Sequence, residues 1–133
     1  MSNLAVYFWV AAGSALGGVA RFWLSGFVAD RLGRTFPWGT LVVNVSGSLI
    51  IGLLASLTAP EGRLSPRAHQ LTFSFLMMGV CGGYTTFSSF SLQTLSLAQE
   101  GQWWQAAGNM VFSAAFCLGA VWLGYALGQI LNR

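Results

Sequence analysis

Residues 79–90 read GVCGGYTTFSSF and form the stretch of the chain with the most distinctive chemistry. The pair Gly82-Gly83 is followed by a tyrosine and two threonines, and none of these residues favours an α-helix. The stretch therefore predicts an interruption in a helix, where backbone carbonyl and amide groups must find partners elsewhere. Unwound carbonyls of this kind can hold Na⁺. A glycine kink packed against a neighbouring helix is the alternative, and the residues alone leave both interpretations open.

Two phenylalanines and several hydroxyl side chains complete this segment. Phe87 and Phe90 lie three residues apart and share a helix face. The edge of an aromatic ring carries partial positive charge, so two ring edges offer a weakly attractive path to a small anion. Thr86, Ser88 and Ser89 add hydroxyl donors beside them. The simpler alternative is that the phenylalanines face lipid or core and the hydroxyls bond to their own helix backbone.

Two further polar stripes occur in apolar segments. Thr40, Asn44 and Ser48 are spaced four residues apart and occupy one helix face. Asn109 and Ser113 repeat this spacing in the last part of the chain. Polar groups in apolar surroundings bond across helices or line water. The stripes therefore indicate either hydrogen bonds that join helices or a hydrated path for an anion.

The composition is that of a membrane protein. Charged residues make up 7% of the 133 residues, against roughly 25% in an average soluble domain. Hydrophobic residues make up 55%, and the mean hydropathy is +0.64. A spanning helix needs about 20 mostly apolar residues. Four uncharged runs meet or approach that length: residues 1–20, 35–60, 68–99 and 101–132.

We therefore predict an all-α membrane protein with four transmembrane helices in a single domain, residues 1–133. The helices are placed at about residues 4–28, 39–59, 67–98 and 103–131, and the third carries the interruption. Asp30, Arg31 and Arg34 are placed in the first loop. Arg21, near the end of the first helix, either extends its charge to the membrane interface or serves a vestibule for an anion.

Small residues recur at a spacing of four in each predicted helix, which lets helices approach closely in lipid. The pairs are Gly13 and Gly17, Ser48 and Gly52, Gly79 and Gly83, and Gly124 and Gly128. They indicate that the helices pack closely and do not reveal what the protein moves.

The loop charges give almost no bias for one orientation in the membrane. Four spans place both termini on one side, together with Arg63, Arg67 and Arg133. On the opposite side lie Arg31 and Arg34. Three basic residues against two leave the positive-inside rule little to act on. We therefore expect insertion in both orientations, with an antiparallel homodimer as the consequence.

Several function classes are disfavoured by what the apolar runs lack. No Asp or Glu lies within a predicted span, whereas a proton-coupled exporter usually needs a carboxylate at depth. Neither a catalytic triad nor a metal-ligand cluster is readable, so an enzyme is not expected, and no basic stripe suits nucleic acid. Cys81 and Cys117 are expected to be free thiols. A small dual-topology multidrug exporter and a structural membrane protein are the alternatives to an anion channel.

Three segments together resemble the small bacterial fluoride channel family known as Fluc or CrcB. They are GGVAR at residues 17–21, GTLVVNVSG at 39–47 and GGYTTFSSF at 82–90. Only the last is specific by itself, while length and four-span layout match over essentially the whole chain. Serine then threonine usually precede the second phenylalanine in the family, and Ser88-Ser89 keeps both hydroxyls. An aromatic residue is common in the family near the position of Asn109.

The resemblance implies a dual-topology homodimer with two antiparallel fluoride pores in the bacterial plasma (inner) membrane. Phe87 and Phe90 would line each pore, with Asn44 and Ser113 as hydrogen-bond donors. Further candidates for the pore or its vestibule are Arg21, Thr40, Thr86, Ser88, Ser89 and Asn109. The implied activity is passive export of fluoride that has entered as the weak acid HF, which reduces fluoride toxicity in the cytoplasm.

The resemblance also implies one structural Na⁺ at the dimer interface, which is not transported. Its ligands would be the backbone carbonyls of Gly82 and Thr85 from both subunits, at the paired interruptions of the third helix. The expected partners are therefore fluoride, Na⁺, membrane lipid and a second copy of the chain, and no nucleic acid.

Overall fold

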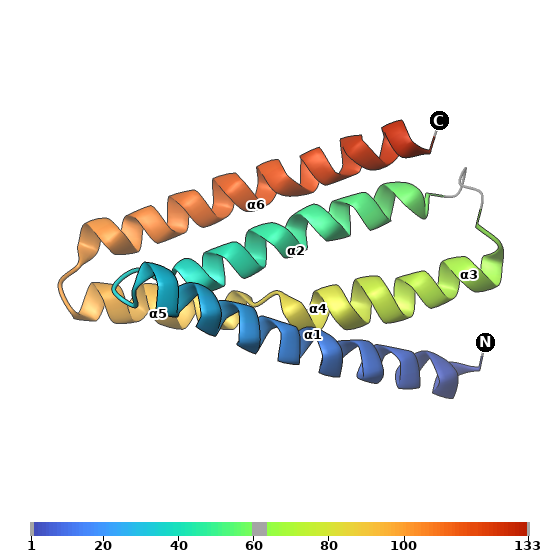
Figure 1. The fold of residues 1–133 in the computed structure, drawn as a ribbon, viewed down its shortest axis with the longest axis horizontal. Coiled ribbons are helices and arrows are strands. Elements are labelled where there is room, and N and C mark those ends of the chain that lie inside the picture. Colours follow the sequence, from blue (N-terminus) through green and yellow to red (C-terminus); the bar gives the residue numbers. More distant parts are fainter. Residues whose placement is uncertain (1, 60–63, 133) are drawn as a thin grey trace.

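A computed structural model of the chain describes residues 2–59 and 64–132 and has the form of a helical bundle (Figure 1). In chain order its elements are α1 (Asn3–Leu32), α2 (Trp38–Leu57), α3 (Pro66–Leu71), the π-helix η1 (Thr72–Cys81), α4 (Gly82–Tyr84), α5 (Phe87–Gln99) and α6 (Trp103–Leu131). No strand occurs in the described part of the chain, so the predicted all-α class is confirmed. The two ends of the chain lie at the same end of the bundle. Arg63 and Arg133, which entered the charge comparison, lie outside the described residues.

Within residues 2–59 and 64–132, three helices, α1, α2 and α6, are long and apolar enough to cross a membrane. Large apolar side chains point outward from the bundle, and Phe22 of α1 and Trp122 of α6 are 83% and 73% exposed. Water would drive such a surface to aggregate, whereas lipid tails solvate it. The remaining predicted helix is present as shorter helical segments between Pro66 and Gln99, which run alongside the other three (Figure 1).

Helix α1 runs further than the sequence predicted. Its predicted end at residue 28 is wrong, because the helix continues to Leu32 and includes Asp30 and Arg31, which had been placed in a loop. Gly33 follows with φ 93°, a backbone conformation that favours glycine, and its N–H donates to a carbonyl of the last turn. The positive charge of Arg31 lies in that turn, where it complements the negative end of the helix dipole.

The predicted interruption of the third helix is confirmed, although it lies beyond the glycine pair. Gly82 stays helical in α4, whereas Thr85 and Thr86 have extended backbones with ψ of 156° and 117°. A Cβ atom at Gly83 would lie 2.5 Å from the Ser14 carbonyl oxygen of α1, so this glycine permits close packing. The glycine pair therefore supports helix contact, and the two threonines make the interruption.

Other small residues predicted from their spacing also lie where helix backbones meet. Cβ atoms added to Gly13 and Gly17 of α1 would collide with backbone atoms of η1. A Cβ atom at Gly124 of α6 would collide with the Leu49 carbonyl of α2. Glycine is thus what lets α1 approach η1 and α6 approach α2, and these two helix pairs frame the bundle.

Replacing Gly124 by alanine should destabilise the bundle by about 1–3 kcal/mol, the usual cost of overpacking. The added methyl group would meet backbone, which has little room to yield. Gly119→Ala on the same helix is the matched control, because a Cβ atom there meets nothing within 4 Å. Thermal unfolding in detergent, followed by circular dichroism, measures both variants. Equal melting temperatures would contradict the close contact between α2 and α6.

Candidate functional site

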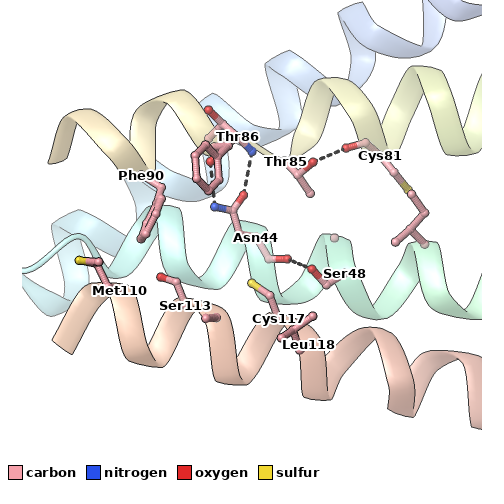
Figure 2. Close-up of a pocket in the computed structure, with 14 residues that line it drawn as sticks. Asn44, Ser48, Cys81, Thr85, Thr86, Phe90, Met110, Ser113, Cys117 and Leu118 are labelled. Atoms are coloured by element: carbon pink, nitrogen blue, oxygen red, sulfur yellow. Dashed lines mark hydrogen bonds between the residues drawn. The ribbon is translucent and has the colours of Figure 1, made fainter. Parts of the chain in front are cut away.

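One side chain of α2 holds the interruption between α4 and α5. Asn44 Nδ2 donates to the Thr86 carbonyl at 2.9 Å, and the Thr86 N–H donates to Asn44 Oδ1 at 2.7 Å (Figure 2). Thr86 is buried, and a buried backbone group without a partner is costly. The Asn44 carboxamide satisfies both the donor and the acceptor of this one unwound residue. We call this pair of hydrogen bonds the Asn44–Thr86 clamp.

The interruption leaves several backbone carbonyls without their helical donors, and those of Gly82 and Thr85 are among them. In a continuous α-helix, the N–H of Thr86 would bond to the Gly82 carbonyl, and that of Ser89 to the Thr85 carbonyl. Instead, Thr86 donates to Asn44, and the Ser89 N–H donates to Thr86 Oγ1 at 3.2 Å. Gly82 is exposed and Thr85 is half-buried, so both released carbonyls lie near the surface of the single chain.

A cavity of about 480 Å³ lies beside the clamp, between α2, α5 and α6. Among its lining residues are six of the predicted site residues: Asn44, Thr85, Thr86, Phe87, Phe90 and Ser113. Ser48 adds a hydroxyl, and Cys81 and Cys117 add thiols that are free, as predicted. No charged side chain of the described residues lines this cavity. We call it the clamp cavity.

The two phenylalanines stand together in the clamp cavity. Their ring centroids are 5.3 Å apart, and the ring planes are tilted by 50°. Figure 2 shows Phe90 pointing from α5 toward α2. Phe87 is 78% exposed, so its ring lies at the open edge of the cavity. A tilted pair presents ring edges as well as faces, and the edges are what attracts an anion.

Asn109 lies behind the cavity wall and not in its lining. It is 2% exposed, and its Nδ2 donates to Thr94 Oγ1 of α5 at 2.9 Å. Ser113, one turn further along α6, lines the cavity and donates from Oγ to Asn109 Oδ1 at 3.3 Å. The polar stripe of α6 therefore joins two helices through Asn109 and meets the cavity through Ser113.

A second cavity, of about 1040 Å³, lies between α1, α2 and α5. Arg21, Thr40 and Ser89 line it, and Thr86 lines both cavities. Arg21 makes no ion pair or hydrogen bond within the described residues, so its charge is available to an anion there. Ser88 lines neither cavity, and its exposed hydroxyl lies 3.2 Å from that of Thr86.

Sequence reasoning did not single out Ser46 and Tyr84 as partners at this site. The hydroxyls of Ser46 and Tyr84 lie 2.8 Å apart and join α2 to α4 just before the interruption. No spacing links these two residues, because 38 positions separate them in the chain. Cys117 had a usable signal, since it follows Ser113 by four residues and therefore shares its helix face.

Comparison with known proteins gives an independent result. The family model described as CrcB-like protein, Camphor Resistance (CrcB), matches residues 8–125, which include all residues that line the two cavities. A Rhodospirillum rubrum protein named fluoride-specific ion channel FluC is 57% identical over 127 residues, covering 96% of this chain and 97% of its own length. Proteins of the same name resemble the chain in Opitutus terrae (57% over 129 residues, 97% and 96% covered) and Methylocella silvestris (53% over 127 residues, 96% and 95% covered).

Replacing Asn44 by leucine should loosen the interruption, because both backbone groups of Thr86 lose their partner. A buried group left unpaired costs about 1–3 kcal/mol, so amide exchange at Thr86 should accelerate about tenfold or more. Hydrogen–deuterium exchange with mass spectrometry, on a peptide spanning residues 84–88, measures this. Ser48→Ala is the matched control, since the Ser48 hydroxyl bonds only to the backbone of its own helix at 2.7 Å. Unchanged exchange in Asn44→Leu would show that the clamp does not hold the interruption.

Proposed function

The chain belongs to the family of CrcB-like proteins, and on this premise we propose that it is a fluoride-specific ion channel of the bacterial inner membrane. The observation that carries the proposal is the convergence of Asn44, Phe87, Phe90 and Ser113 on one uncharged cavity. Relatives named fluoride channels match along nearly the whole chain. Passive flow would let fluoride leave the cell and so limit its toxicity. The proposed function is therefore that of an ion channel, which is not an enzyme class.

The clamp cavity offers an anion weak, neutral contacts. An asparagine carboxamide carries two N–H donors, and Asn44 uses one of them on the Thr86 carbonyl. The second remains for an ion in the cavity, beside the edges of Phe87 and Phe90. Conduction requires binding that is favourable enough for entry and weak enough for release. Neutral donors without a fixed charge meet that requirement, while Arg21 in the second cavity draws anions toward the site.

Selectivity for fluoride over chloride requires donors that offset the larger cost of dehydrating fluoride. Fluoride is small and strongly hydrated, so a narrow path must replace its water with closely spaced donors. We propose that Asn44 and Ser113, on facing helices, supply donors on two sides of the ion, and that the phenylalanine rings set the width. Chloride is larger, so donors spaced for fluoride would surround it less well.

The placement of the acidic residues supports passive flow over coupled export. Asp30 lies in the last turn of α1 and Glu100 follows the end of α5, and both are exposed. Glu61 lies outside the described residues. A coupled multidrug exporter needs a carboxylate inside the membrane. The clamp cavity contains none among its lining residues.

We further propose that the segments on either side of the interruption together form a fourth membrane crossing. The part before the interruption runs from Pro66 to Tyr84, and α5 continues it from Phe87 to Gln99. The joined length of the two pieces exceeds the about 20 residues of a spanning helix. Four crossings would place both termini on one side, in agreement with their position at one end of the bundle.

The released carbonyls of Gly82 and Thr85 support an antiparallel homodimer. Lipid cannot hydrogen-bond to a carbonyl at membrane depth, so protein, water or an ion must cover it. A second copy packed in the opposite direction would cover both carbonyls and close the cavity at the exposed Phe87 ring. Doubled by the second copy, the two carbonyls form an all-oxygen set of the kind that holds Na⁺ in membrane proteins. When bound, Na⁺ would supply a fixed positive charge at the centre of the dimer.

Purified protein in liposomes should release fluoride rapidly and retain chloride, as read with ion-selective electrodes. Phe90→Ile should lower fluoride efflux by about fivefold while the protein still assembles, because a ring edge worth about 1 kcal/mol is lost from the path. Phe112→Ile is the matched control, since Phe112 is half exposed and stacks only on Phe116 of the same helix. Absence of fluoride flux from correctly assembled protein would reject the channel.

A C-terminal tag should be accessible to protease in about half of the molecules in inside-out membrane vesicles, because dual insertion gives no preferred side. A tag that is entirely protected or entirely cleaved would exclude the antiparallel arrangement.

Replacing Na⁺ by a large organic cation should shift the purified protein from dimer toward monomer upon dilution, measured by single-molecule photobleaching. A dimer fraction independent of Na⁺ would exclude the proposed ion ligands without affecting the fluoride assay.

A further inference from the structure

Three polar side chains form a directed chain of hydrogen bonds behind the clamp cavity. Ser113 donates to Asn109 Oδ1 at 3.3 Å, Asn109 Nδ2 donates to Thr94 Oγ1 at 2.9 Å, and the Thr94 hydroxyl donates to the Phe90 carbonyl at 2.7 Å. Asn109 is 2% exposed and Ser113 is 9% exposed. Thr94 lies outside the lining of both cavities. We call this chain of hydrogen bonds the Asn109 relay.

In this direction the relay withholds the Ser113 hydrogen from the cavity. A serine hydroxyl has a single hydrogen, and here it is committed to Asn109 Oδ1. Only the lone pairs of Ser113 then face the cavity, and lone pairs repel an anion. If Ser113 turned alone, Asn109 Oδ1 would be left unpaired in a buried position, which is unfavourable.

The relay can reverse without losing a hydrogen bond. A half-turn of the Asn109 carboxamide exchanges its oxygen and nitrogen at nearly the same positions. Its N–H then donates to Ser113 Oγ, and the Thr94 hydroxyl donates to its oxygen. The Phe90 carbonyl keeps the bond from the Thr94 N–H, its partner within α5. Three bonds exist before the turn, and three exist after it once the freed Ser113 hydroxyl donates to an anion.

We propose that Asn109 is a positioning residue that switches Ser113 between a closed state and an anion-donating state by this reversal. The inference rests on the proposed fluoride channel and concerns how its cavity accepts the ion. In the reversed state, the Asn109 N–H polarises the Ser113 hydroxyl, which strengthens the bond that Ser113 gives to an anion. The reversal needs a group at each end that can both donate and accept, and Ser113 and Thr94 are both of this kind.

The surroundings favour a relay that responds to the anion alone. Helices α2, α5 and α6 contain no Asp, Glu, Lys, Arg or His within their bounds. No fixed charge on these helices therefore holds the Asn109 dipole in one direction. Its orientation is set by its two hydroxyl partners and, through Ser113, by what occupies the cavity.

The test measures the fluoride concentration that gives half-maximal efflux from liposomes, together with the maximal rate. Thr94→Val removes the hydroxyl and keeps the side-chain shape, so the closed relay keeps one hydrogen bond and the reversed, anion-bound relay keeps two. Because the wild type has three in both states, the variant should lower the half-maximal concentration by up to about tenfold, the value of one hydrogen bond to an ion. Thr94→Ser keeps the hydroxyl and should behave as the wild type. A role in packing alone predicts the opposite order, since valine fills the site better than serine.

A double variant separates the relay from general disturbance. Ser113→Ala should raise the half-maximal concentration by about tenfold, and adding Thr94→Val to it should change it no further. Ser48→Ala is the matched control, because Ser48 lines the same cavity but bonds to backbone outside the relay. The factors by which Ser48→Ala and Thr94→Val each change the half-maximal concentration should multiply when the two are combined. If the factors of Thr94→Val and Ser113→Ala also multiply, the relay is overturned.

Assembly and wild-type flux decide the remaining outcomes. Size-exclusion chromatography reports whether each variant folds, and Asn109→Leu, which abolishes the reversal, replaces Thr94→Val if that variant does not assemble. Adding Asn109→Leu to Ser113→Ala should then leave the half-maximal concentration unchanged. A further change would overturn the relay. No fluoride flux in the wild type would reject the proposed channel. Normal flux in the wild type with an unaltered half-maximal concentration in Thr94→Val would reject the relay alone.

Discussion

Backbone polar groups inside a membrane must be satisfied within the protein, and the arrangement of this chain follows from that constraint. Helices α1, α2 and α6 meet it internally, since each is continuous. The interruption between α4 and α5 cannot, so Asn44 supplies from α2 what Thr86 lacks. The cavity, the neighbouring rings and the released carbonyls all lie around this one side chain.

Close helix contact is the second requirement, because the clamp works only if α2 lies near the interruption. Gly47 of α2 makes this possible, since a Cβ atom there would collide with the Thr85 side chain. The Ser46 and Tyr84 hydroxyls add a hydrogen bond between α2 and α4, just before the interruption. Glycine and hydroxyl side chains on α2 therefore serve one purpose, which is to bring a carboxamide to an unwound backbone.

Much of this could be read from the sequence, but only where the information is local. The helix predicted at about residues 103–131 agrees with the bounds of α6, Trp103 and Leu131, because the residues on either side break the apolar pattern. The end of α1 was misplaced, because Asp30 and Arg31 look like loop residues although charges are well tolerated in a last helical turn. The presence of an interruption was predictable from residues 82–86, whereas its position depended on packing against α1.

The partners of the polar residues could not be predicted, because they lie far away in the chain. Spacing marked Asn44 as a polar residue at depth, but its partner Thr86 is 42 positions away. The same spacing grouped Asn109 with Ser113, yet one lies behind the cavity wall and the other within the lining. Which of two neighbouring polar residues faces a cavity depends on the helix that packs against them, here α5 through Thr94.

Thr86 lines both cavities, and its backbone is fixed on both sides by Asn44. The backbone of Thr86, which lies between the two cavities, therefore cannot move aside, since such a movement would break two buried hydrogen bonds. If the proposed ion path crosses this point, it must rely on the rotation of side chains, which takes picoseconds to nanoseconds where the side chain is exposed. Lid-like openings take microseconds to milliseconds. In the proposed channel, the backbone at this point would thus stay in place, and only side chains such as those of the Asn109 relay would move as the ion passes.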